Sequence, residues 1–374
     1  MAYKVLFFVD RMRVGGIQML LLNLQTHFDP SVIQCEYLVL DDGETYEYEE
    51  RFKSAGAKLY KLKDVWLDSP YDYIKYCRAM DNFFKEHHDY AAVHMNASSK
   101  NFMLLYYARK YGIKKRIVHS HNTGFQTNNP AKKMIGDVFK KPMMQFATDY
   151  FACSAIAGEW LFGKKIVDSG KVYVMPNAID LEKFEFNNDT RMRIRKELGI
   201  SDDKILIGHV GRFTLQKNHK FLIDIFKKIH EKNDKTMLIM AGIGELMEDT
   251  KHQAEELGLS SCVQFLGFRN DVNDLNQAMD VFLMPSFYEG FPVTGIEAQA
   301  SGCPCVFSNT ITKEAALLDT TVYLSLESPA DLWADTVLEI AKTSHNRNDS
   351  KALLKAKGFD INEMSRKLEK IYIS

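Results

Sequence analysis

Two glutamates, Glu289 and Glu297, stand eight residues apart in the stretch PSFYEGFPVTGIEAQASGCPCV. Gly290, Pro292 and Gly295 lie between them, and the letters IEAQA predict the opening turn of a helix. One carboxylate therefore precedes a strand-to-helix junction and the other lies just inside the helix. Two carboxylates can serve as the acid and the base or nucleophile of a glycoside hydrolase. They can equally hold two parts of one polar ligand, and the spacing leaves both interpretations open.

A second pair of charged residues, Arg212 and Lys217, follows the apolar run ILIGHVG and precedes a helix that we expect to begin near Asn218. Two cations at the start of a helix oppose the helix dipole. A bound anion would remove that conflict, because arginine can hold a phosphate with two hydrogen bonds and lysine can act as a point charge. The alternative is that both side chains are solvated loop cations.

Glycines follow several predicted strands. Gly15 and Gly16 lie at the first strand-to-helix turn, where backbone N–H groups could face an anion or the turn could simply be tight. Gly242 follows a later strand, and Phe268 with Arg269 follows the next one, where a planar base could lie against the backbone and ring. No G-x-G-x-x-G motif is present, which disfavours a nicotinamide or flavin cofactor.

His119 and His121 end another predicted strand, in IVHSHNTGF. Alternate residues of a strand share a face, so both rings could point into one space. Two histidines without a third ligand are a poor zinc signal, and the chain contains no D-x-D element of the kind that holds a divalent ion in metal-dependent transferases. We expect no metal, one histidine buried in the core, and His121 facing a ligand because it lies nearer the loop.

The elements that must position these residues alternate between strands and helices. Short apolar runs predict strands at KVLFFVD, QCEYLVL, AKLYKL, YAAVHMN, RIVHSH, DYFACS, KVYVMP, KILIGHVG, TMLIMAG, CVQFLG, VFLMPS, PCVFSN and TVYLSL. Stretches of helical spacing such as NHKFLIDIFKKIHEK separate them. Continuous apolar strands with helices between them predict parallel sheets covered on both faces.

The strands pause once, between Met175 and Asp203, where a charged helical pattern replaces them. We interpret this stretch as the joint between two Rossmann-like domains. Ligands of open parallel sheets bind beyond the carboxyl ends of the strands, so the loops described above and the cleft between the domains are the expected site.

The composition is that of an ordinary globular protein. The length of 374 residues suits about two domains of roughly 100–200 residues. A net charge of −1 gives the whole chain no bias toward nucleic acid or membrane. The first apolar run is shorter than the roughly 7–15 residues of a signal peptide, and no run approaches the roughly 18 residues of a spanning helix. We therefore expect a cytoplasmic protein whose six cysteines are reduced.

Taken together, these motifs make the sequence resemble a family 4 retaining glycosyltransferase with the two-domain GT-B fold, of the kind found in bacterial exopolysaccharide and capsule synthesis. The resemblance covers nearly the whole chain. It rests on GGIQMLLLNL, HSHNTGF, VMPNAIDLEKF, GHVGRFTLQKNH, VQFLGFRNDV and PSFYEGFPVTGIEAQASGCPCVFSN. The E-x₇-E pair is the hallmark of the family, although VTGIEAQA replaces the commoner run of branched aliphatic residues before the second glutamate.

The resemblance assigns roles to residues of this sequence. Arg212 and Lys217 would hold the diphosphate of a nucleotide sugar, Glu289 the hydroxyls of its sugar, and Glu297 the ribose. The backbone N–H groups of Gly290, Phe291 and Val293 would help Glu289 to bind the sugar. Gly16 would approach the diphosphate and His121 the sugar. The remaining residues expected to contact the donor are Gly242, Phe268 and Arg269.

The resemblance also implies the rest of the enzyme. Residues 1–178 would bind the acceptor, with 360–374 crossing back onto them, and residues 179–359 would bind the donor. We expect a UDP-sugar donor, a glycan acceptor linked to a polyprenyl diphosphate, and retention of configuration without a protein nucleophile, metal or cofactor. Two alternatives remain. One is a non-catalytic nucleotide-sugar-binding protein, and the other is another GT-B enzyme such as a UDP-sugar epimerase or a phosphorylase. A phosphorylase would need a lysine that binds pyridoxal covalently, and no motif in the sequence indicates one.

Cations are concentrated between residues 100 and 145, where the one acid is Asp137. They are Lys100, Arg109, Lys110, Lys114, Lys115, Arg116, Lys132, Lys133, Lys140 and Lys141. Within PAKKMIGDVFKKPMMQF the lysines alternate with apolar residues, a pattern typical of a helix lying on an anionic membrane. We expect binding to the inner face of the cell membrane. A solvated face over ordinary core residues is the alternative, and RNA ranks behind both.

Overall fold

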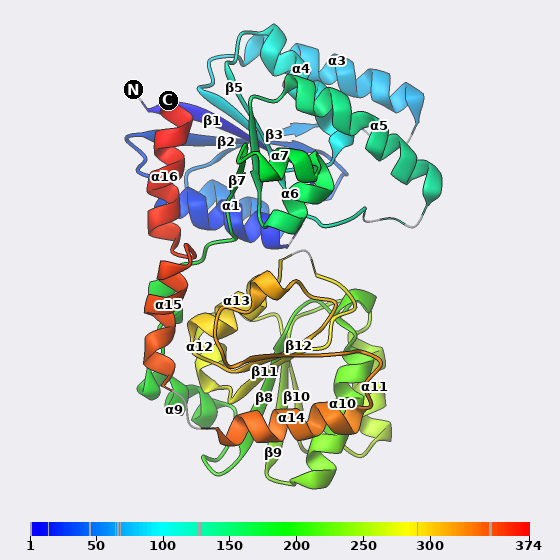
Figure 1. Ribbon diagram of the computed structural model, residues 1–374, viewed down its shortest axis with the longest axis vertical. Helices are drawn as coiled ribbons and strands as arrows, with labels where there is room; N and C mark the ends of the chain where they lie inside the picture. Colours follow the sequence, from blue (N-terminus) through cyan, green and yellow to red (C-terminus); the bar gives the residue numbers. More distant parts are fainter. Residues whose placement is uncertain are drawn as a thin grey trace. The chain divides into compact units, whose positions relative to one another are not determined.

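The computed structural model describes residues 2–13, 15–44, 46–63, 65, 67, 69–125, 127, 129–289, 291–343 and 346–374. The chain divides into two compact units (Figure 1). The N-terminal unit comprises Met1–Ile179 and Asp360–Ser374, and the C-terminal unit comprises Asp180–Phe359. These bounds differ by one residue from the predicted joint at 178/179.

Seven parallel strands form the sheet of the N-terminal unit within the described residues, in the order β3-β2-β1-β4-β5-β6-β7. They are β1 (Tyr3–Val9), β2 (Ile33–Leu40), β3 (Lys58–Leu62), β4 (Ala92–Met95), β5 (Lys115–Ser120), β6 (Asp149–Ala152) and β7 (Val172–Val174). Strands β2 and β3 follow in turn on one side of β1, whereas β4, β5, β6 and β7 follow in turn on its other side. The loops that follow β1 and β4 therefore run in opposite directions, which opens a crevice at the carboxyl edge.

The helices of this unit are α1 (Gly16–His27), α2 (Glu47–Ser54), α3 (Pro70–Glu86), α4 (Phe102–Lys110), α5 (Pro130–Phe146), α6 (Ala155–Phe162), α7 (Lys164–Asp168) and α16 (Ile361–Ile373). Among the described residues, side chains cap four of them, α3, α5, α6 and α16. A proline opens α3 and α5, and the preceding Ser69 and Asn129 side chains accept hydrogen bonds from the first-turn amides. Asp360 caps α16 in the same manner.

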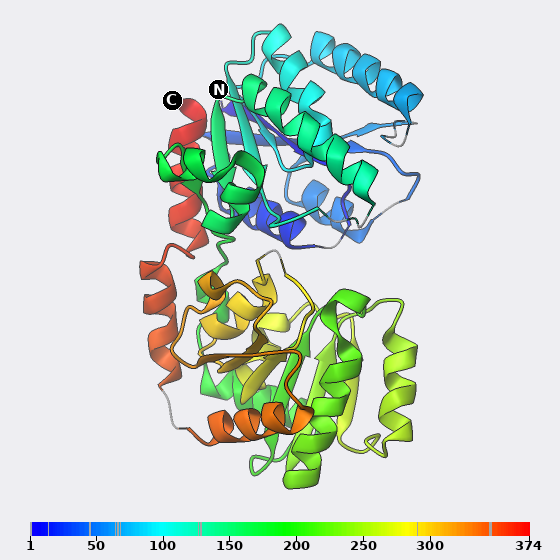
Figure 2. The ribbon, with the colours of Figure 1, turned by 45° about the vertical axis from the view of Figure 1, so that its right-hand side comes forward.

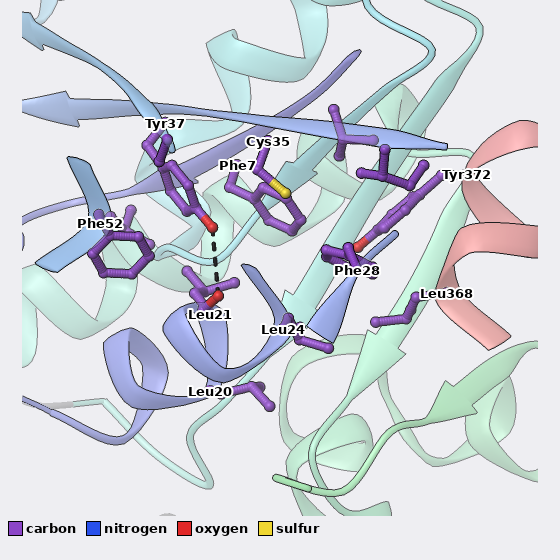
Figure 3. Close-up of a cluster of buried hydrophobic side chains, with 14 of the residues drawn as sticks. Phe7, Leu20, Leu21, Leu24, Phe28, Cys35, Tyr37, Phe52, Leu368 and Tyr372 are labelled. Atoms are coloured by element: carbon purple, nitrogen blue, oxygen red, sulfur yellow. Dashed lines mark hydrogen bonds between the residues drawn. The ribbon is translucent and has the colours of Figure 1, made fainter. Parts of the chain in front are cut away.

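Helix α16 belongs to the N-terminal unit although it comes last in the chain. It lies against α1 and β1, and both chain ends lie at the same end of this unit in Figures 1 and 2. One face of α16 contributes Ile361, Met364, Leu368 and Tyr372 to the core. Figure 3 shows Leu368 and Tyr372 in one cluster with side chains of β1, β2 and α1.

Six parallel strands form the sheet of the C-terminal unit in the described part of the chain, in the order β10-β9-β8-β11-β12-β13. They are β8 (Ile205–Val210), β9 (Thr236–Ala241), β10 (Val263–Gly267), β11 (Val281–Met284), β12 (Cys305–Ser308) and β13 (Thr321–Leu324). The order reverses between β8 and β11, so the crevice of this sheet lies there.

Helices cover this second sheet. They are α8 (Leu181–Phe184), α9 (Asn188–Glu197), α10 (His219–Lys232), α11 (Met247–Glu256), α12 (Val272–Ala278), α13 (Val293–Ala300), α14 (Ala330–Lys342) and α15 (Ser350–Ala356). Helices α10 and α14 pack side by side, against β9 and β11 respectively (Figure 2). The prediction of two Rossmann-like domains with parallel sheets is confirmed, and each strand predicted from an apolar run is present.

Candidate active site

The topology of the C-terminal unit places the predicted charged residues at its crevice. Arg212 and Lys217 follow β8, while Glu289 and helix α13 follow the neighbouring strand β11. A short 3-10 turn, Leu215–Lys217, leads into Asn218, whose φ of 57° is the single positive value outside glycine in the described residues. The Asn218 side chain donates a 3.1 Å hydrogen bond to the carbonyl of Pro285, at the end of β11. This left-handed turn therefore brings the β8 loop onto the β11 loop.

Lys217 and Glu289 form an ion pair across these two loops. The Lys217 Nζ lies 2.7 Å from Glu289 Oε1, and the side chains are only 14% and 8% exposed. Sequence reasoning named both residues as ligand groups but did not foresee that they would bond to each other. It expected a bound anion to offset the cations at the start of α10, whereas here the Glu289 carboxylate offsets Lys217. An ammonium has three protons and a carboxylate about four acceptor sites, so each partner keeps capacity for a ligand.

Arg212 differs from Lys217 in its surroundings. Its side chain is exposed, and no carboxylate within the described residues pairs with it. The loop that carries it is instead fixed through its backbone, since Phe213 N–H donates to Ile243 O at 3.0 Å. A guanidinium held by a fixed loop and lacking an acid partner suits an incoming anion.

Glu297 lies one turn inside α13 and is 5% exposed. No group in the described part of the chain donates a hydrogen bond to its carboxylate, and burial raises the pKa of Glu297 to about 8. A buried carboxylate without donors is unfavourable unless it takes up a proton or finds a partner. The hydroxyls of a ligand would supply such donors, so this glutamate is a candidate ligand contact.

The backbone ahead of Glu297 retains open donors. In the described residues, no acceptor is bonded to the N–H of Phe291 or of Val293, the first residue of α13. The ring of Phe291 is buried and stacks on Phe359 with centroids 5.9 Å apart, which anchors the turn. Gly290, the third predicted backbone donor, lies outside the described residues.

Gly242, which we predicted to contact the donor, lies where two loops of the C-terminal unit meet. Its N–H donates to Gly267 O at 2.7 Å, so that amide is not free for a ligand. A Cβ atom at Gly242 would lie 1.9 Å from Gly211 O, and one at Gly244 would lie 2.4 Å from Phe213 O. Both glycines therefore allow the β9 loop to lie directly against the loop of Arg212.

Arg269 is also committed within the protein. It forms two hydrogen bonds of 2.7 and 2.6 Å to the Asp271 carboxylate and a third of 3.1 Å to Glu197, and these acids raise the pKa of its guanidinium. Nε and Nη2 therefore already have carboxylate partners, and the expected contact of this side chain with the donor stays a prediction. Phe268, next to it, is 39% exposed after β10 and remains a surface for a base.

In the N-terminal unit, the predicted Gly16 is the exposed first residue of α1, after β1. Its N–H has no protein acceptor within the described residues, as is usual in the first turn of a helix. The loop is held by Gln18, whose side chain donates to Arg11 O at 2.6 Å. A backbone donor at the α1 start is therefore open at the crevice of this sheet.

His119 and His121 share a face as predicted, and their ring centroids are 3.9 Å apart. His119 is buried and His121 is only 9% exposed, and the expected contact of His121 with a ligand stays a prediction. Burial lowers the pKa of His121 to about 3, so its ring is neutral. Asn96 donates to His94 O, which leaves its Oδ1 to accept from His121 Nε2–H at 2.8 Å.

Sequence reasoning missed the partners of these histidines. His94 Nε2 lies 3.2 Å from His119 Nδ1, and His94 Nδ1 lies 2.7 Å from the hydroxyl of Tyr372 on α16. Burial lowers the pKa of His94 to about 3 and also holds the pKa of His119 well below its ordinary value. The run YAAVHMN did contain a signal, because His94 and Asn96 alternate at the end of a strand as His119 and His121 do.

Two absences hold for the described residues. No group of three or more histidine, cysteine, aspartate and glutamate side chains there could hold a metal ion. No helix in that part of the chain is long and apolar enough to cross a membrane.

Comparisons with known proteins agree with the geometry. Residues 14–183 match Glycosyltransferase Family 4, and residues 190–354 match glycosyl transferases group 1. EpsF of Bacillus subtilis strain 168, which carries the name of a glycosyltransferase, is 32% identical over 372 residues, covering 99% of this chain and 96% of EpsF. The UDP-Gal:alpha-D-GlcNAc-diphosphoundecaprenol alpha-1,3-galactosyltransferase of Escherichia coli is 31% identical over 226 residues, covering 59% of this chain and 58% of that enzyme.

A solved structure gives the same fold. HepE of Anabaena, in complex with UDP and glucose, superimposes with a TM-score of 0.79 at 17% identity, and the match covers 100% of both chains. That likeness concerns the two-sheet GT-B fold alone. The full-length relationship to EpsF, together with the two family matches, shows that this chain is a glycosyltransferase that joins a Glycosyltransferase Family 4 domain to a group 1 domain in the GT-B fold.

Proposed function

We propose that this glycosyltransferase moves a sugar, with retention of configuration, from a UDP-sugar to a glycan acceptor carried on a lipid diphosphate, in the synthesis of a bacterial surface polysaccharide. Two comparisons support the substrates. HepE binds UDP and glucose, and the Escherichia coli relative is named for a UDP-galactose donor and a diphosphoundecaprenol-linked acceptor. The N-terminal unit is the proposed acceptor-binding part.

The observation that carries the proposal is the sorting of charge along one crevice, with cations after β8 and carboxylates after β11. A nucleotide sugar offers an anionic diphosphate between two hydroxyl-bearing rings. Arg212 and Lys217 would hold the diphosphate, Glu289 the transferred sugar, and Glu297 the ribose. The N–H groups of the turn before α13 would assist Glu289.

Whether each remaining predicted residue is proposed to contact the donor depends on its exposure and on its bonds within the protein. Phe268 offers an exposed ring for the base. Gly16 would approach the diphosphate with its N–H, and His121 would lie beside the sugar as a neutral ring. We leave Gly242 and Arg269 as residues that fix the neighbouring loops, because the amide of the first and the guanidinium of the second have protein partners.

The proposed chemistry needs no protein nucleophile. The acceptor hydroxyl attacks the anomeric carbon from the face that the diphosphate leaves, so one C–O bond forms as the other breaks. The hydroxyl proton passes to the departing phosphate oxygen, and UDP is released. Negative charge grows on that diphosphate during the step, and fixed cations in a crevice stabilise it. We propose that Arg212 and Lys217 do so without a metal ion.

Binding and transfer assays test the proposal. Thermal shift with UDP-, GDP- and ADP-sugars should show the largest stabilisation with a UDP-sugar. Glu289→Ala and Lys217→Ala should each reduce transfer below detection while the fold persists. Lys228→Ala, which removes an exposed ion pair with Glu231 on α10, is the control and should be fully active. Normal turnover in both site variants, or a wild-type protein that binds no UDP-sugar, would contradict the assignment.

A surface of α5 supports a second part of the proposal, binding to anionic lipid at the inner face of the membrane. Met134 and Val138 are 65% and 63% exposed and lie one turn apart, between exposed lysines at 132, 133 and 141. Exposed apolar side chains flanked by lysines suit an interfacial helix. Lys140, unlike these exposed lysines, is held within the protein, because its Nζ donates a hydrogen bond to Trp160 O and lies 4.5 Å from the centre of the Trp160 ring.

Vesicle flotation tests the surface. Reversal of the three solvated lysines (Lys132→Glu, Lys133→Glu, Lys141→Glu) should abolish binding to phosphatidylserine vesicles, since each cation contributes on the order of 1 kcal/mol near such a membrane. The matched control reverses Lys165, Lys196 and Lys342, which are exposed on α7, α9 and α14. Equal binding by both triple variants would refute the membrane surface while leaving the sugar-transfer proposal intact.

A further inference from the structure

Gln216, the residue before Lys217, contacts the Glu289 loop at three points. Its side-chain Nε2 donates to Tyr288 O at 2.9 Å and, over a longer 3.3 Å, to Glu289 Oε2. Its own carbonyl accepts from Phe287 N–H at 2.9 Å. Nothing in the motif comparison or in the family matches assigns a role to this glutamine.

These contacts divide the Glu289 carboxylate between two donors. Lys217 holds Oε1 at 2.7 Å and Gln216 holds Oε2. The last torsion of a glutamate side chain has a broad, weakly restricted distribution, so a single ion pair would leave the carboxylate plane loosely set. A second donor on the other oxygen fixes that plane, and each oxygen still has an unused lone pair.

The amide of Gln216 suits this task because it is neutral. It orients the carboxylate without adding a charge that would compete with Lys217 for Glu289 or with Arg212 for an anion. Its bond to Tyr288 O also fixes the backbone next to the glutamate, in a loop where Phe287 and Tyr288 are themselves exposed and contribute little packing. Side chain and backbone of Glu289 are therefore held by the same residue.

We propose that Gln216 is a positioning residue for sugar transfer, which sets the orientation in which Glu289 receives the hydroxyls of the transferred sugar. The inference rests on the proposed function, because it concerns the same donor site. It goes beyond that function by separating recognition of the sugar, which depends on Gln216, from recognition of the nucleotide, which does not.

The chain contains a matched control, Gln253 on α11. Its Nε2 also donates to a backbone carbonyl, Lys220 O at 3.1 Å, and to a carboxylate, Asp224 Oδ1 at 2.8 Å. The chemistry lost in Gln253→Met is therefore the same as in Gln216→Met, but the carboxylate concerned lies on α10 and outside the proposed site.

The experiment compares wild type, Gln216→Met, Gln216→Glu and Gln253→Met in transfer kinetics and in calorimetric titrations with UDP and with the UDP-sugar. For Gln216→Met we expect kcat to fall roughly 10- to 100-fold, as for a small misplacement of a substrate-holding group. UDP affinity should stay within about twofold, while the UDP-sugar loses its advantage over UDP. Gln216→Glu should lose more, because its carboxylate repels Glu289 and competes for Lys217.

The outcomes separate the inference from the function on which it rests. Gln253→Met should keep wild-type kinetics, even if its melting temperature falls. Unchanged kcat and UDP-sugar affinity in Gln216→Met, or an equal loss in Gln253→Met, would overturn the positioning role while the wild type remains an active transferase. Failure of the wild type itself to bind or use a UDP-sugar would overturn the proposed function, and the inference with it.

Discussion

The two units share a topology but place different chemistry at the carboxyl edges of their sheets. In the N-terminal unit, the strands β4 and β5 end in three buried, neutral histidines: His94 is bonded to His119 and to Tyr372, while His121 is bonded to Asn96 and its ring lies against His119. In the C-terminal unit the corresponding loops carry the Lys217–Glu289 ion pair and the exposed guanidinium of Arg212, beside the buried carboxyl group of Glu297. The two units therefore share a fold but present different chemical groups to a ligand.

The difference follows from burial and pairing. The histidines are deeply buried, and the loss of hydration lowers their pKa values and keeps them neutral. Lys217 and Glu289 are nearly as buried, yet each has the other within 2.7 Å. A ligand with both charge and hydroxyls is thus expected to deliver its charge to the C-terminal unit. Five substitutions would break or sharpen this contrast.

The largest effect should come from the exposed cation. Arg212→Met should lower kcat by about 10²–10³, because it removes a donor aimed at charge that develops on the diphosphate. His121→Phe, which replaces a neutral imidazole of the N-terminal unit by a phenyl ring, should lower kcat by less than about tenfold. Single-turnover transfer rates measure both. Equal losses in the two variants would erase the contrast between the units.

Glu297→Gln should have opposite effects on stability and binding. The unfolded chain releases the Glu297 proton near pH 4.5, whereas the folded protein holds it up to about pH 8, so the free energy of unfolding falls as pH rises between these values. The substitution should therefore raise the free energy of unfolding at pH 8 by on the order of 1–3 kcal/mol. Affinity for UDP should fall roughly tenfold or more.

Urea unfolding at pH 6 and pH 8 with calorimetric titration of UDP would test Glu297→Gln. At pH 4.5 the stability gain should largely vanish, which serves as the internal control. A substitution that left the pH dependence of unfolding unchanged would show that Glu297 already has a partner in the ligand-free protein.

The neutral histidines should make the N-terminal unit sensitive to acid. The pKa of His94 is lowered from 6.5 to about 3, so below pH 6.5 the unfolded chain takes up a proton that the folded protein refuses. Each such histidine lowers the free energy of unfolding by up to about 1.4 kcal/mol per pH unit. Between pH 6.5 and 5, His94→Phe should therefore reduce the loss of stability by about 2 kcal/mol.

The slope with pH, rather than the absolute stability, is the useful readout for His94→Phe, because the substitution also removes the bond to Tyr372. His252→Gln is the control, since this histidine is exposed on α11. A slope unchanged by His94→Phe would indicate that the buried histidines are charged in the folded protein.

Arg269→Met should have the smallest effect on catalysis. Because its guanidinium is bound to Asp271 and Glu197, we expect kcat and the affinity for UDP to change less than about threefold, with a stability loss of about 1 kcal/mol. Transfer kinetics and urea unfolding measure the two quantities. A loss of UDP affinity as large as that caused by Arg212→Met would show that Arg269 contacts the donor, as the resemblance implied.

The fold was predictable because its signals are local. Apolar runs such as ILIGHV and TMLIMA mark strands wherever they are buried on both faces, and the run of charged residues after Met175 marked the joint. The carboxyl-edge loops could then be identified from chain order alone, and with them Arg212, Lys217 and the two glutamates.

The contacts within the site were not predictable, because they join distant parts of the chain. The Lys217–Glu289 bond depends on β8 lying next to β11, and the Tyr372–His94 bond depends on α16 packing against the first sheet. The close approach of Gly242 to Gly211 was not predictable either, because it depends on the loop after β9 meeting the loop after β8. The left-handed turn at Asn218 had no signal that we recognised.

The return of α16 to the first sheet has a consequence for how the protein is made. A ribosome completes residues 180–359 before it supplies Ile361, Leu368 and Tyr372, which fill the core of the N-terminal unit. Domains commonly fold in the order of synthesis, but here the first half must wait while the second half is already complete. The nascent N-terminal half would carry an uncovered apolar face for that whole interval, which makes it the part of this protein that most needs chaperone protection.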